Sequence, residues 1–179
     1  MVQQTTIVTG EYIFYFGPES VFSHWHKSLF VIDGIEYCCV EQFLMFNKAV
    51  LFMDFETAKK IRSSSSPQRH RYLGRQVTGF NKSAWQQCCL QYAAKANEAK
   101  FTQHAHLHKI LEKTGNRRFA EASPYDRNWG IGLSLSNPNI YKRSSWRGKN
   151  LAGFALEQAR EKIFFCSFPN QELVCDFIL

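Results

Sequence analysis

Residues 40–52, VEQFLMFNKAVLF, are apolar at most positions, and their spacing predicts a helix that is apolar nearly all round. Such a helix has to be covered by other elements on most of its surface, so the chain must fold around it. Glu41 and Lys48 interrupt this surface on nearly the same face, about 10 Å apart along the helix axis. They form either an exposed ion pair, which would contribute little, or part of a pocket, where burial raises a carboxyl pKa and lowers an amine pKa.

Strand patterns precede this helix, and mainly helical patterns follow it. YIFYF at 12–16 predicts a strand, and the Asp33-Gly34 pair between two β-rich runs in 29–40 predicts a hairpin. Asp54 is the expected N-cap of the next helix. The remaining expected elements are helices over 54–64, 81–101, a segment ending near Lys113 and 151–165, and a strand over 118–123. A chain of 179 residues is expected to form one domain over 1–179, with a core of about 12–165.

Basic residues are concentrated in the later part of the chain. The sequence has 22 Lys and Arg against 15 Asp and Glu, a net charge of +7. Residues 1–60 carry −3 (4 basic, 7 acidic), whereas residues 61–179 carry +10 (18 basic, 8 acidic). Such an excess favours an anionic partner such as a phosphate, a nucleotide or a nucleic acid. An ordinary solvated basic surface is the alternative.

The composition excludes several classes of protein. With 45% hydrophobic and 21% charged residues, the chain is expected to be globular and not disordered. Apolar runs stay well short of the roughly 20 residues of a membrane helix, and MVQQTTIVTGEY lacks the basic and apolar regions of a signal peptide. The protein is therefore expected inside the cell, in the cytoplasm or nucleus, not secreted and not at a membrane. No stable protein partner is expected.

The cysteines and histidines do not predict a metal site. Adjacent cysteines lack the spacing of about two to four residues usual for zinc ligands, so buried, reduced thiols are expected. The six cysteines are Cys38, Cys39, Cys88, Cys89, Cys166 and Cys175. His104 and His108 are four apart on a helix, but no third ligand is evident. Neither a metal nor a cofactor is expected.

Polar and aromatic side chains gather in three further stretches. ESVFSHW (19–25) and EASPYDRNWGIG (121–132) follow strands, where a scaffold can position binding residues, and YKRSSWRGKNLAGF (141–154) leads into a helix whose N-terminus could bind an anion. A capped turn, a structural loop and a solvated basic loop are the respective alternatives. The candidate residues for binding substrate are Ser20, Ser23, His24, Arg127, Trp129, Gly130, Trp146, Arg147, Lys149 and Asn150.

Taken in order, these pieces resemble the NADAR superfamily (NAD- and ADP-ribose-associated, also called YbiA-like) from about Ile13 to Glu161. The motifs are FYFGPESVFSHW, DGIEYCCVEQFLMFNKAVLFMD, LGRQV with GF and KSAW, AKFTQHAHLHKIL with KTGNRRFAEASPYDRNWGIGL, and WRGKNLAG. The resemblance implies a compact, mainly helical α+β domain with a small N-terminal β-hairpin or sheet and a polar pocket. It also implies an N-glycosidase. Some members split phosphoribosylamino intermediates of riboflavin synthesis, and others remove ADP-ribose from guanine in nucleic acids.

The motifs carry the family's site residues onto this chain. The pocket glutamate and lysine match Glu41 and Lys48, and the tryptophan after the Gly-Phe turn matches Trp85. The other matches are Asp126, Trp129, Gly130 and Asn150. The sequence departs from the family pattern at Asn128, where a large apolar residue is usual. It departs again on the last helix, where Ala152, Ala155, Glu157 and Ala159 replace larger aliphatic residues and bring its packing into question.

The resemblance and the residue pattern together predict an N-glycoside hydrolase that removes ADP-ribose from a modified nucleobase, with guanine in DNA or RNA as the expected base. Glu41 would transfer protons, Lys48 would form a Schiff base with the sugar, and Asp126 would hold ribose hydroxyls. ADP-ribose or ADP-ribosylated nucleic acid is the expected partner. The alternatives are an N-glycosidase of phosphoribosylamino riboflavin intermediates and a non-catalytic ADP-ribose-binding module.

Overall fold

The computed structural model describes residues 5–165, so Cys166 and Cys175 lie outside the described residues. The strands in this part are β1 (Thr6–Val8), β2 (Tyr12–Tyr15), β3 (Phe30–Ile32), β4 (Ile35–Tyr37) and β5 (Arg118–Glu121). The helices are α1 (Val40–Leu51), α2 (Phe55–Arg62), α3 (Pro67–Arg75), α4 (Lys82–Thr102), α5 (Ala105–Glu112) and α6 (Leu151–Phe164), with short 3-10 turns η1 (Pro138–Tyr141) and η2 (Arg143–Ser145). The expected mainly helical α+β fold is confirmed. Among these helices, none has the length and apolarity needed to cross a membrane.

Local sequence signals account for the first half of the fold. Asp33 and Gly34 have φ angles of 53° and 75°, as a two-residue type I′ turn requires, and β3 pairs antiparallel with β4. The Asp54 side chain accepts a hydrogen bond from the Thr57 amide, so the expected N-cap of α2 is confirmed. α1 is buried along most of its length, as its apolar surface predicts.

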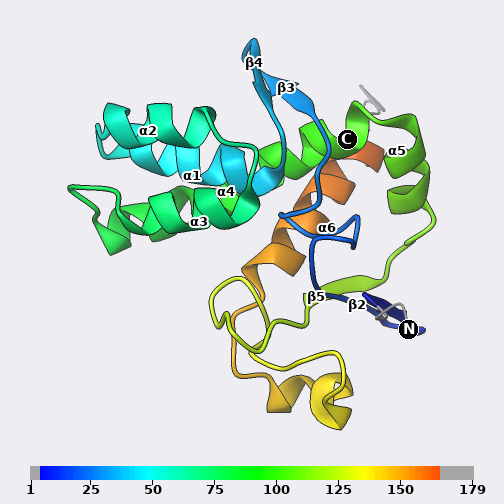
Figure 1. Cartoon of the computed structure of the whole chain (residues 1–179). Helices are drawn as coiled ribbons and strands as arrows, with labels where there is room; N and C mark the ends of the chain where they lie inside the picture. Colours follow the sequence, from blue (N-terminus) through cyan, green and yellow to red (C-terminus); the bar gives the residue numbers. More distant parts are fainter. Residues whose placement is uncertain (1–4, 166–179) are drawn as a thin grey trace, which may run out of the picture.

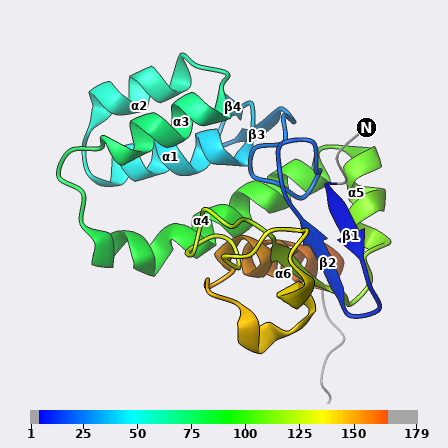
Figure 2. The ribbon, with the colours of Figure 1, turned by 60° about the horizontal axis from the view of Figure 1, so that its bottom comes forward.

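The second sheet joins segments that are far apart in the sequence. Its order is β1-β2-β5, with β2 antiparallel to β1 and parallel to β5; Figure 2 shows β1 and β2 side by side. All four residues of β2 are buried. Ile13 and Tyr15 face a core shared with α4, α5 and α6, whereas Tyr12 and Phe14 pack under the loop that follows β5. Both faces of the sheet are therefore covered.

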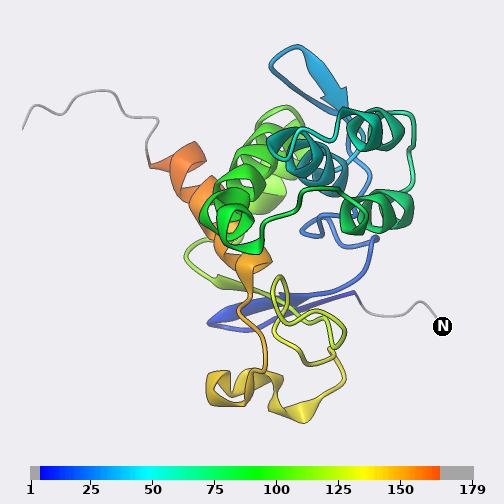
Figure 3. The ribbon, with the colours of Figure 1, turned by 90° about the vertical axis from the view of Figure 1, so that its left-hand side faces the viewer.

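α6 lies between α4 and the sheet, while α1, α2 and α3 group on the far side of α4 (Figures 1 and 3). Small buried side chains, such as Ala93 on α4 and Ala155 on α6, lie where these helices meet. Ala152 and Ala159 are also buried, and Glu157 accepts a hydrogen bond from the Phe119 amide of β5. The departures from the family pattern on α6 therefore fit a tightly packed helix.

Trp146 belongs to the cover over the sheet. Its indole nitrogen donates to the Ile140 carbonyl oxygen at 2.7 Å, and its ring meets Tyr12 edge-on at 5.5 Å between centroids. It packs in the cluster formed by Tyr12, Phe14, Ile131 and Ile140. The prediction that Trp146 binds substrate is wrong, because this side chain closes the outer face of the sheet and lies outside the cavity lining.

Gly153 lies where α6 packs closely against β5, and its replacement tests this packing. A Cβ atom there would overlap the Phe119 carbonyl oxygen and the Asn150 side-chain amide. Gly153→Ala should lower the free energy of unfolding by about 1–3 kcal/mol, despite the better helix propensity of alanine, as measured by chemical denaturation. Gly10→Ala is the matched control, because a Cβ there meets open space. Equal stability of both variants would contradict the close packing.

Candidate active site

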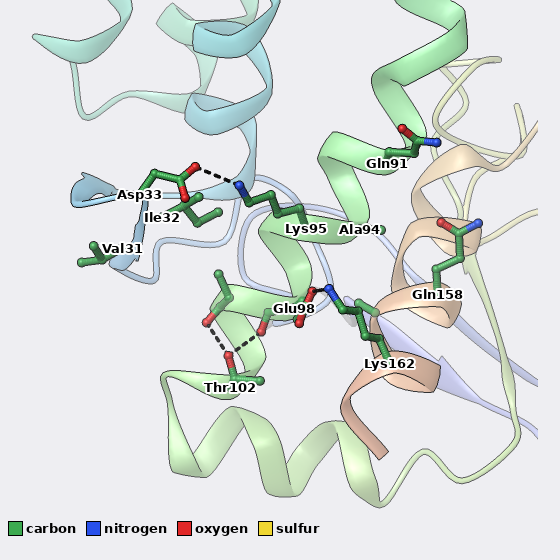
Figure 4. Close-up of a pocket in the computed structure, with 12 residues that line it drawn as sticks. Val31, Ile32, Asp33, Gln91, Ala94, Lys95, Glu98, Thr102, Gln158 and Lys162 are labelled. Atoms are coloured by element: carbon green, nitrogen blue, oxygen red, sulfur yellow. Dashed lines mark hydrogen bonds and ion pairs between the residues drawn. The ribbon is translucent and has the colours of Figure 1, made fainter. Parts of the chain in front are cut away.

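Two hollows lie on different sides of α4. One, between the β3–β4 hairpin, α4 and α6, is shown in Figure 4. Its charged side chains are paired with one another: Lys95 with Asp33, and Lys162 with Glu98, each at 2.8 Å. The other is a cavity of about 590 Å³, within the usual range for small-molecule sites. It is lined by the loop at 16–25, by α1, α3 and Trp85 of α4, and by residues 121–129, and it holds most of the predicted site residues.

Glu41 forms part of the cavity wall at the first turn of α1. Its side chain is buried, and its amide donates to the His24 carbonyl oxygen at 3.0 Å, which joins the loop at 16–25 to the helix. The Trp25 indole hydrogen-bonds the carboxyl group. Burial raises the pKa of Glu41 to about 7; Arg71 and the Trp25 bond oppose this shift, and the charge of Asp126 adds to it. The carboxyl group therefore exchanges protons near neutral pH.

Glu121 and Asp126 bring two more carboxyl groups to the same cavity. Burial raises the pKa of Glu121 to about 8, with further increases from the charges of Asp126 and Glu41 and an opposing effect from Arg71. Arg71 pairs with Asp126 at 3.3 Å. Three acids thus share the field of one guanidinium, and two of them retain protons near neutral pH.

Lys48 lies on the cavity wall at the last turn of α1. Its Nζ donates to the Gly74 carbonyl oxygen at 2.6 Å and sits 3.9 Å from the centroid of the Phe80 ring. Burial lowers the pKa of Lys48, as does Arg75, whereas Glu41 raises it. Glu41 is buried and Lys48 binds a backbone carbonyl, so the alternative of an exposed ion pair between them is wrong.

Asp126 folds the loop that contains Trp129. Its Oδ1 accepts hydrogen bonds from the amides of Asn128 and Trp129, both at 2.9 Å. The Trp129 ring meets the edge of His24 at 5.3 Å. This turn places Asp126, Arg127 and Trp129 on one wall of the cavity, as the sequence predicts for a loop positioned by the scaffold.

The loop at 16–25 is held from beneath by a buried lysine. Lys100 donates to the carbonyl oxygens of Val21 and Ser23 at 2.7 and 3.0 Å, and no part of it is exposed. Ser23 and His24 line the cavity, and burial, with a smaller effect from Lys100, lowers the pKa of His24 to about 3, so its ring is neutral. Ser20 lies outside the cavity lining, where its Oγ contacts Thr6 Oγ1 at 3.2 Å.

The start of α6 supports the site loop and is not an anion site. The expected N–H donors are already bonded to carbonyl oxygens: Leu151 to Asn128 at 3.1 Å, and Ala152 to Trp129 at 3.1 Å. Three preceding amides do the same: Arg147 to Ile131, Lys149 to Arg127 and Asn150 to Gly130. The phosphate-binding prediction for this helix end is therefore wrong, because the chain itself takes up these donors.

Asn150 occupies the N-cap position without capping the helix. It is left-handed, with φ 59°, and its side chain bridges β5, donating to the Phe119 carbonyl oxygen at 2.7 Å and accepting from the Glu121 amide at 3.0 Å. Gly130 packs too tightly for a Cβ, and Arg147 and Lys149 are exposed outside the cavity lining. These residues hold the Asp126–Gly130 loop against β5 and α6.

The sequence pattern does not predict several of the residues that line the cavity. They include Trp25, Arg71, Arg75, Glu121 and Tyr125. Two signals were available: Arg71 and Arg75 are four residues apart on a helix, hence on one face, and Glu121 ends a predicted strand just before the candidate loop. The histidines of HAHLH have structural partners instead, since His104 bonds the Leu29 carbonyl oxygen and His108 packs on Phe164.

Known proteins resemble this chain over nearly all of its described length. The NADAR domain family matches residues 13–164. The chain is 36% identical to N-glycosidase R617 of Acanthamoeba polyphaga mimivirus, over 86% of this chain and 97% of that protein. It is 30% identical to Protein irg-1 of Caenorhabditis elegans (87% and 81%) and 29% identical to N-glycosidase YbiA of Escherichia coli (83% and 82%). The NMR structure of Escherichia coli YbiA shares the fold, with a TM-score of 0.71, 24% identity and coverage of 94% and 95%.

The burial of Glu41 makes a measurable prediction about stability. In the unfolded chain the carboxyl group ionises near its usual pKa of 4.5, but in the folded chain it keeps its proton until about pH 7. The stabilisation that protonated Glu41 provides is thus complete below pH 4.5 and is lost as the pH rises to about 7. Glutamine does not titrate, so the free energy of unfolding of Glu41→Gln does not fall in this way. Relative to the wild type, it should rise by on the order of 1–3 kcal/mol between pH 4.5 and about 7.

Urea denaturation at a series of pH values measures this difference. Glu112 provides the control, since Glu112→Gln removes an exposed carboxyl group and leaves the buried one in place. A constant stability difference between Glu41→Gln and the wild type from pH 4 to 8 would contradict the raised pKa.

Proposed function

This chain belongs to the NADAR domain family, and we propose that it removes ADP-ribose from a modified nucleobase, with guanine in DNA or RNA as the expected base. Relatives from a virus and from bacteria are named N-glycosidases, and the chain is accordingly a hydrolase acting on N-glycosyl bonds. The proposal concerns its substrate and the roles of its residues.

The observation that carries the proposal is the buried carboxyl group of Glu41, in one cavity with the amine of Lys48. A general acid–base works best when its pKa lies near the working pH, and the pKa of Glu41 is raised to about 7. An amine acts as a nucleophile only when neutral, and burial lowers the pKa of Lys48. A module that merely binds ADP-ribose has no need of either shift.

The rest of the cavity supports a ligand with two phosphates and more than one ring. Arg75 and Arg127 line it, and within the described residues neither forms an ion pair with a carboxylate. Flat aromatic surfaces are supplied by Trp25, Tyr125 and Trp129. A phosphoribosylamine, with one phosphate and one base, would engage only one of these arginines and one of these aromatic rings. ADP-ribose attached to a base has two phosphates and two bases, and it can engage both arginines and several rings. Arg75 and Arg127 replace Arg147 and Lys149 as the proposed phosphate ligands.

The proposed reaction begins at the anomeric carbon, which carries the ring oxygen and the exocyclic amine of the base. Proton transfer from Glu41 to the ring oxygen opens the sugar and leaves an iminium carbon. The Lys48 amine, in its unprotonated form, adds to this carbon. A proton then passes from the Lys48 nitrogen to the nitrogen of the base, and the base departs as a free amine. The resulting Schiff base on Lys48 is hydrolysed by water, with Glu41 accepting a proton, and ADP-ribose is released.

Asp126 has a narrower proposed role than direct catalysis. One of its oxygens holds the Asn128 and Trp129 amides, and the other pairs with Arg71. The remaining lone pairs of this carboxylate can accept bonds from ribose hydroxyls. We therefore assign Asp126 to shaping the loop and holding the sugar.

The substrate is tested by incubating the protein with oligonucleotides ADP-ribosylated on each base and reading the products by mass. We expect ADP-ribosyl-guanine to return to the unmodified mass with release of intact ADP-ribose, and Glu41→Gln to slow this by about 100- to 10,000-fold. Hydrolysis of a phosphoribosylaminopyrimidine, without release from any modified oligonucleotide, would overturn the proposal in favour of the riboflavin-intermediate reaction.

A pair of charge variants in the same assay tests the phosphate contacts. Arg75→Gln should raise KM by about 10- to 100-fold, the effect of losing one charge-assisted bond to phosphate. Lys149→Gln is the matched control and should leave KM within about twofold, because Lys149 is exposed outside the cavity lining. A larger increase in KM for Lys149→Gln than for Arg75→Gln would place the phosphate-binding site at the start of α6 instead.

Lys48 is expected to be the covalent nucleophile. Borohydride added during turnover should reduce the Schiff base and leave ADP-ribose attached to Lys48, detected by peptide mass. Lys48→Arg should abolish both trapping and cleavage, because a guanidinium keeps the charge but does not act as a nucleophile here. An active Lys48→Arg enzyme with no trapped lysine would mean direct attack by water, with Glu41 as the sole acid–base.

A further inference from the structure

Three side chains that commonly bind metals converge behind the wall of the cavity. Cys38 and Cys39 lie between β4 and α1, and His70 lies on α3. The Cys38 and Cys39 sulfurs are 3.8 Å apart, and Cys39 Sγ is 3.8 Å from His70 Nδ1. All three ligand atoms lie within 4.8 Å of one another. The packing of α3 on α1 creates this cluster, which is why the spacing of the cysteines did not predict it.

The separations fit the coordination sphere of a small thiophilic ion. Two sulfurs bound to zinc at tetrahedral angles are about 3.8 Å apart, and a sulfur and an imidazole nitrogen are about 3.6 Å apart. The two distances that involve Cys39 are both 3.8 Å. Cys39 and His70 are buried, whereas Cys38 is half-buried and forms the side of the cluster nearest to solvent.

His70 is held in the orientation that a metal ligand needs. Its Nε2 lies 2.9 Å from the Ser64 carbonyl oxygen, and a carbonyl can only accept, so Nε2 carries the proton. The lone pair of Nδ1 then faces Cys39. Histidines that bind zinc commonly donate their other N–H group to a backbone carbonyl in this way.

We propose that Cys38, Cys39 and His70 form a binding site for a thiophilic divalent ion of the Zn²⁺ class. Two thiolates and one imidazole bind the ion, water takes the fourth position beside half-buried Cys38, and two thiol protons pass to solvent. Soft sulfur ligands disfavour Mg²⁺ and Ca²⁺. The site departs from the expectation that the chain holds no metal, and it does not depend on the proposed substrate.

Such an ion would link two helices that line the cavity. His70 directly precedes Arg71 on α3, and Cys39 precedes Glu41 of α1 by two residues. The ion would therefore fix the positions of α1 and α3 relative to each other from outside the cavity. We expect saturating Zn²⁺ to raise the melting temperature of the folded chain.

The other adjacent pair, Cys88-Cys89, is a matched control within the chain. It lies inside α4, two turns from the start of the helix, where successive side chains point about 100° apart. Within residues 5–165, only the Cys38–Cys39–His70 group brings three such ligands together. Substitution of Cys88 therefore removes a half-buried thiol from an adjacent pair without touching the proposed site.

The test is a titration of the reduced, metal-free full chain. Calorimetry with Zn²⁺ and thiolate-to-metal charge-transfer absorption with Cd²⁺ should both show one ion per chain. Cys39→Ser and His70→Gln should each weaken binding by at least about tenfold, and Cys88→Ser should leave it unchanged. Absence of binding in the wild type, or binding that survives both Cys39→Ser and His70→Gln, would overturn the proposal.

A second measurement uses only the wild-type chain, so that misfolding of a variant cannot obscure the result. Thiol alkylation is followed residue by residue with and without Zn²⁺. The ion should slow the alkylation of Cys38 at least about tenfold and leave that of Cys88 unchanged. Equal rates at Cys38 in the two conditions would overturn the site.

Discussion

The burial of the Glu41 carboxyl group is the constraint on which the rest of the site depends. The groups that replace water around it come from separate parts of the chain: Trp25 from the loop before β3, Arg71 from α3 and Asp126 from the loop after β5. Desolvation outweighs the attraction of Arg71 and the bond from Trp25, because the pKa still rises to about 7. Burial of this carboxyl group therefore lowers the stability of the fold at neutral pH, and it leaves a group that can both donate and accept a proton there.

Backbone hydrogen bonds hold the opposite wall of the cavity. The carbonyl groups of Arg127, Asn128 and Trp129 each accept a bond from the segment that starts α6. Gly148 allows this segment to approach, since a Cβ there would overlap the Gly130 carbonyl oxygen. The WRGKN motif therefore lies one layer behind the cavity, where it fixes the loop that carries Asp126 and Trp129.

The sequence predicts the fold correctly where a local signal decides the structure. The Asp33-Gly34 turn, the Asp54 cap and the apolar surface of α1 each appear as predicted, because turn geometry, capping and burial depend on neighbouring residues. The sequence does not predict β1, because its three residues become a strand only by pairing with β2.

The site was predictable in part for the same reason. The positions of buried Glu41 and half-buried Lys48 follow from one helix. Contacts between distant segments decide the rest of the site. The amides at the start of α6 bond the loop, which removes the predicted anion site, and the packing of α3 on α1 brings in Arg71 and His70. Glu121 likewise joins the cavity only through the fold. A free helix N-terminus looks identical in sequence to one whose donors are already taken, so only the fold separates the two.

Desolvation keeps Glu41 protonated until near neutral pH, and an NMR titration of the glutamate side-chain carboxyl carbons measures this property. The Glu41 signal, assigned by its loss in Glu41→Gln, should titrate with a midpoint of about 7. A midpoint near 4.5, the usual value for glutamate, would show that burial does not raise the pKa of Glu41.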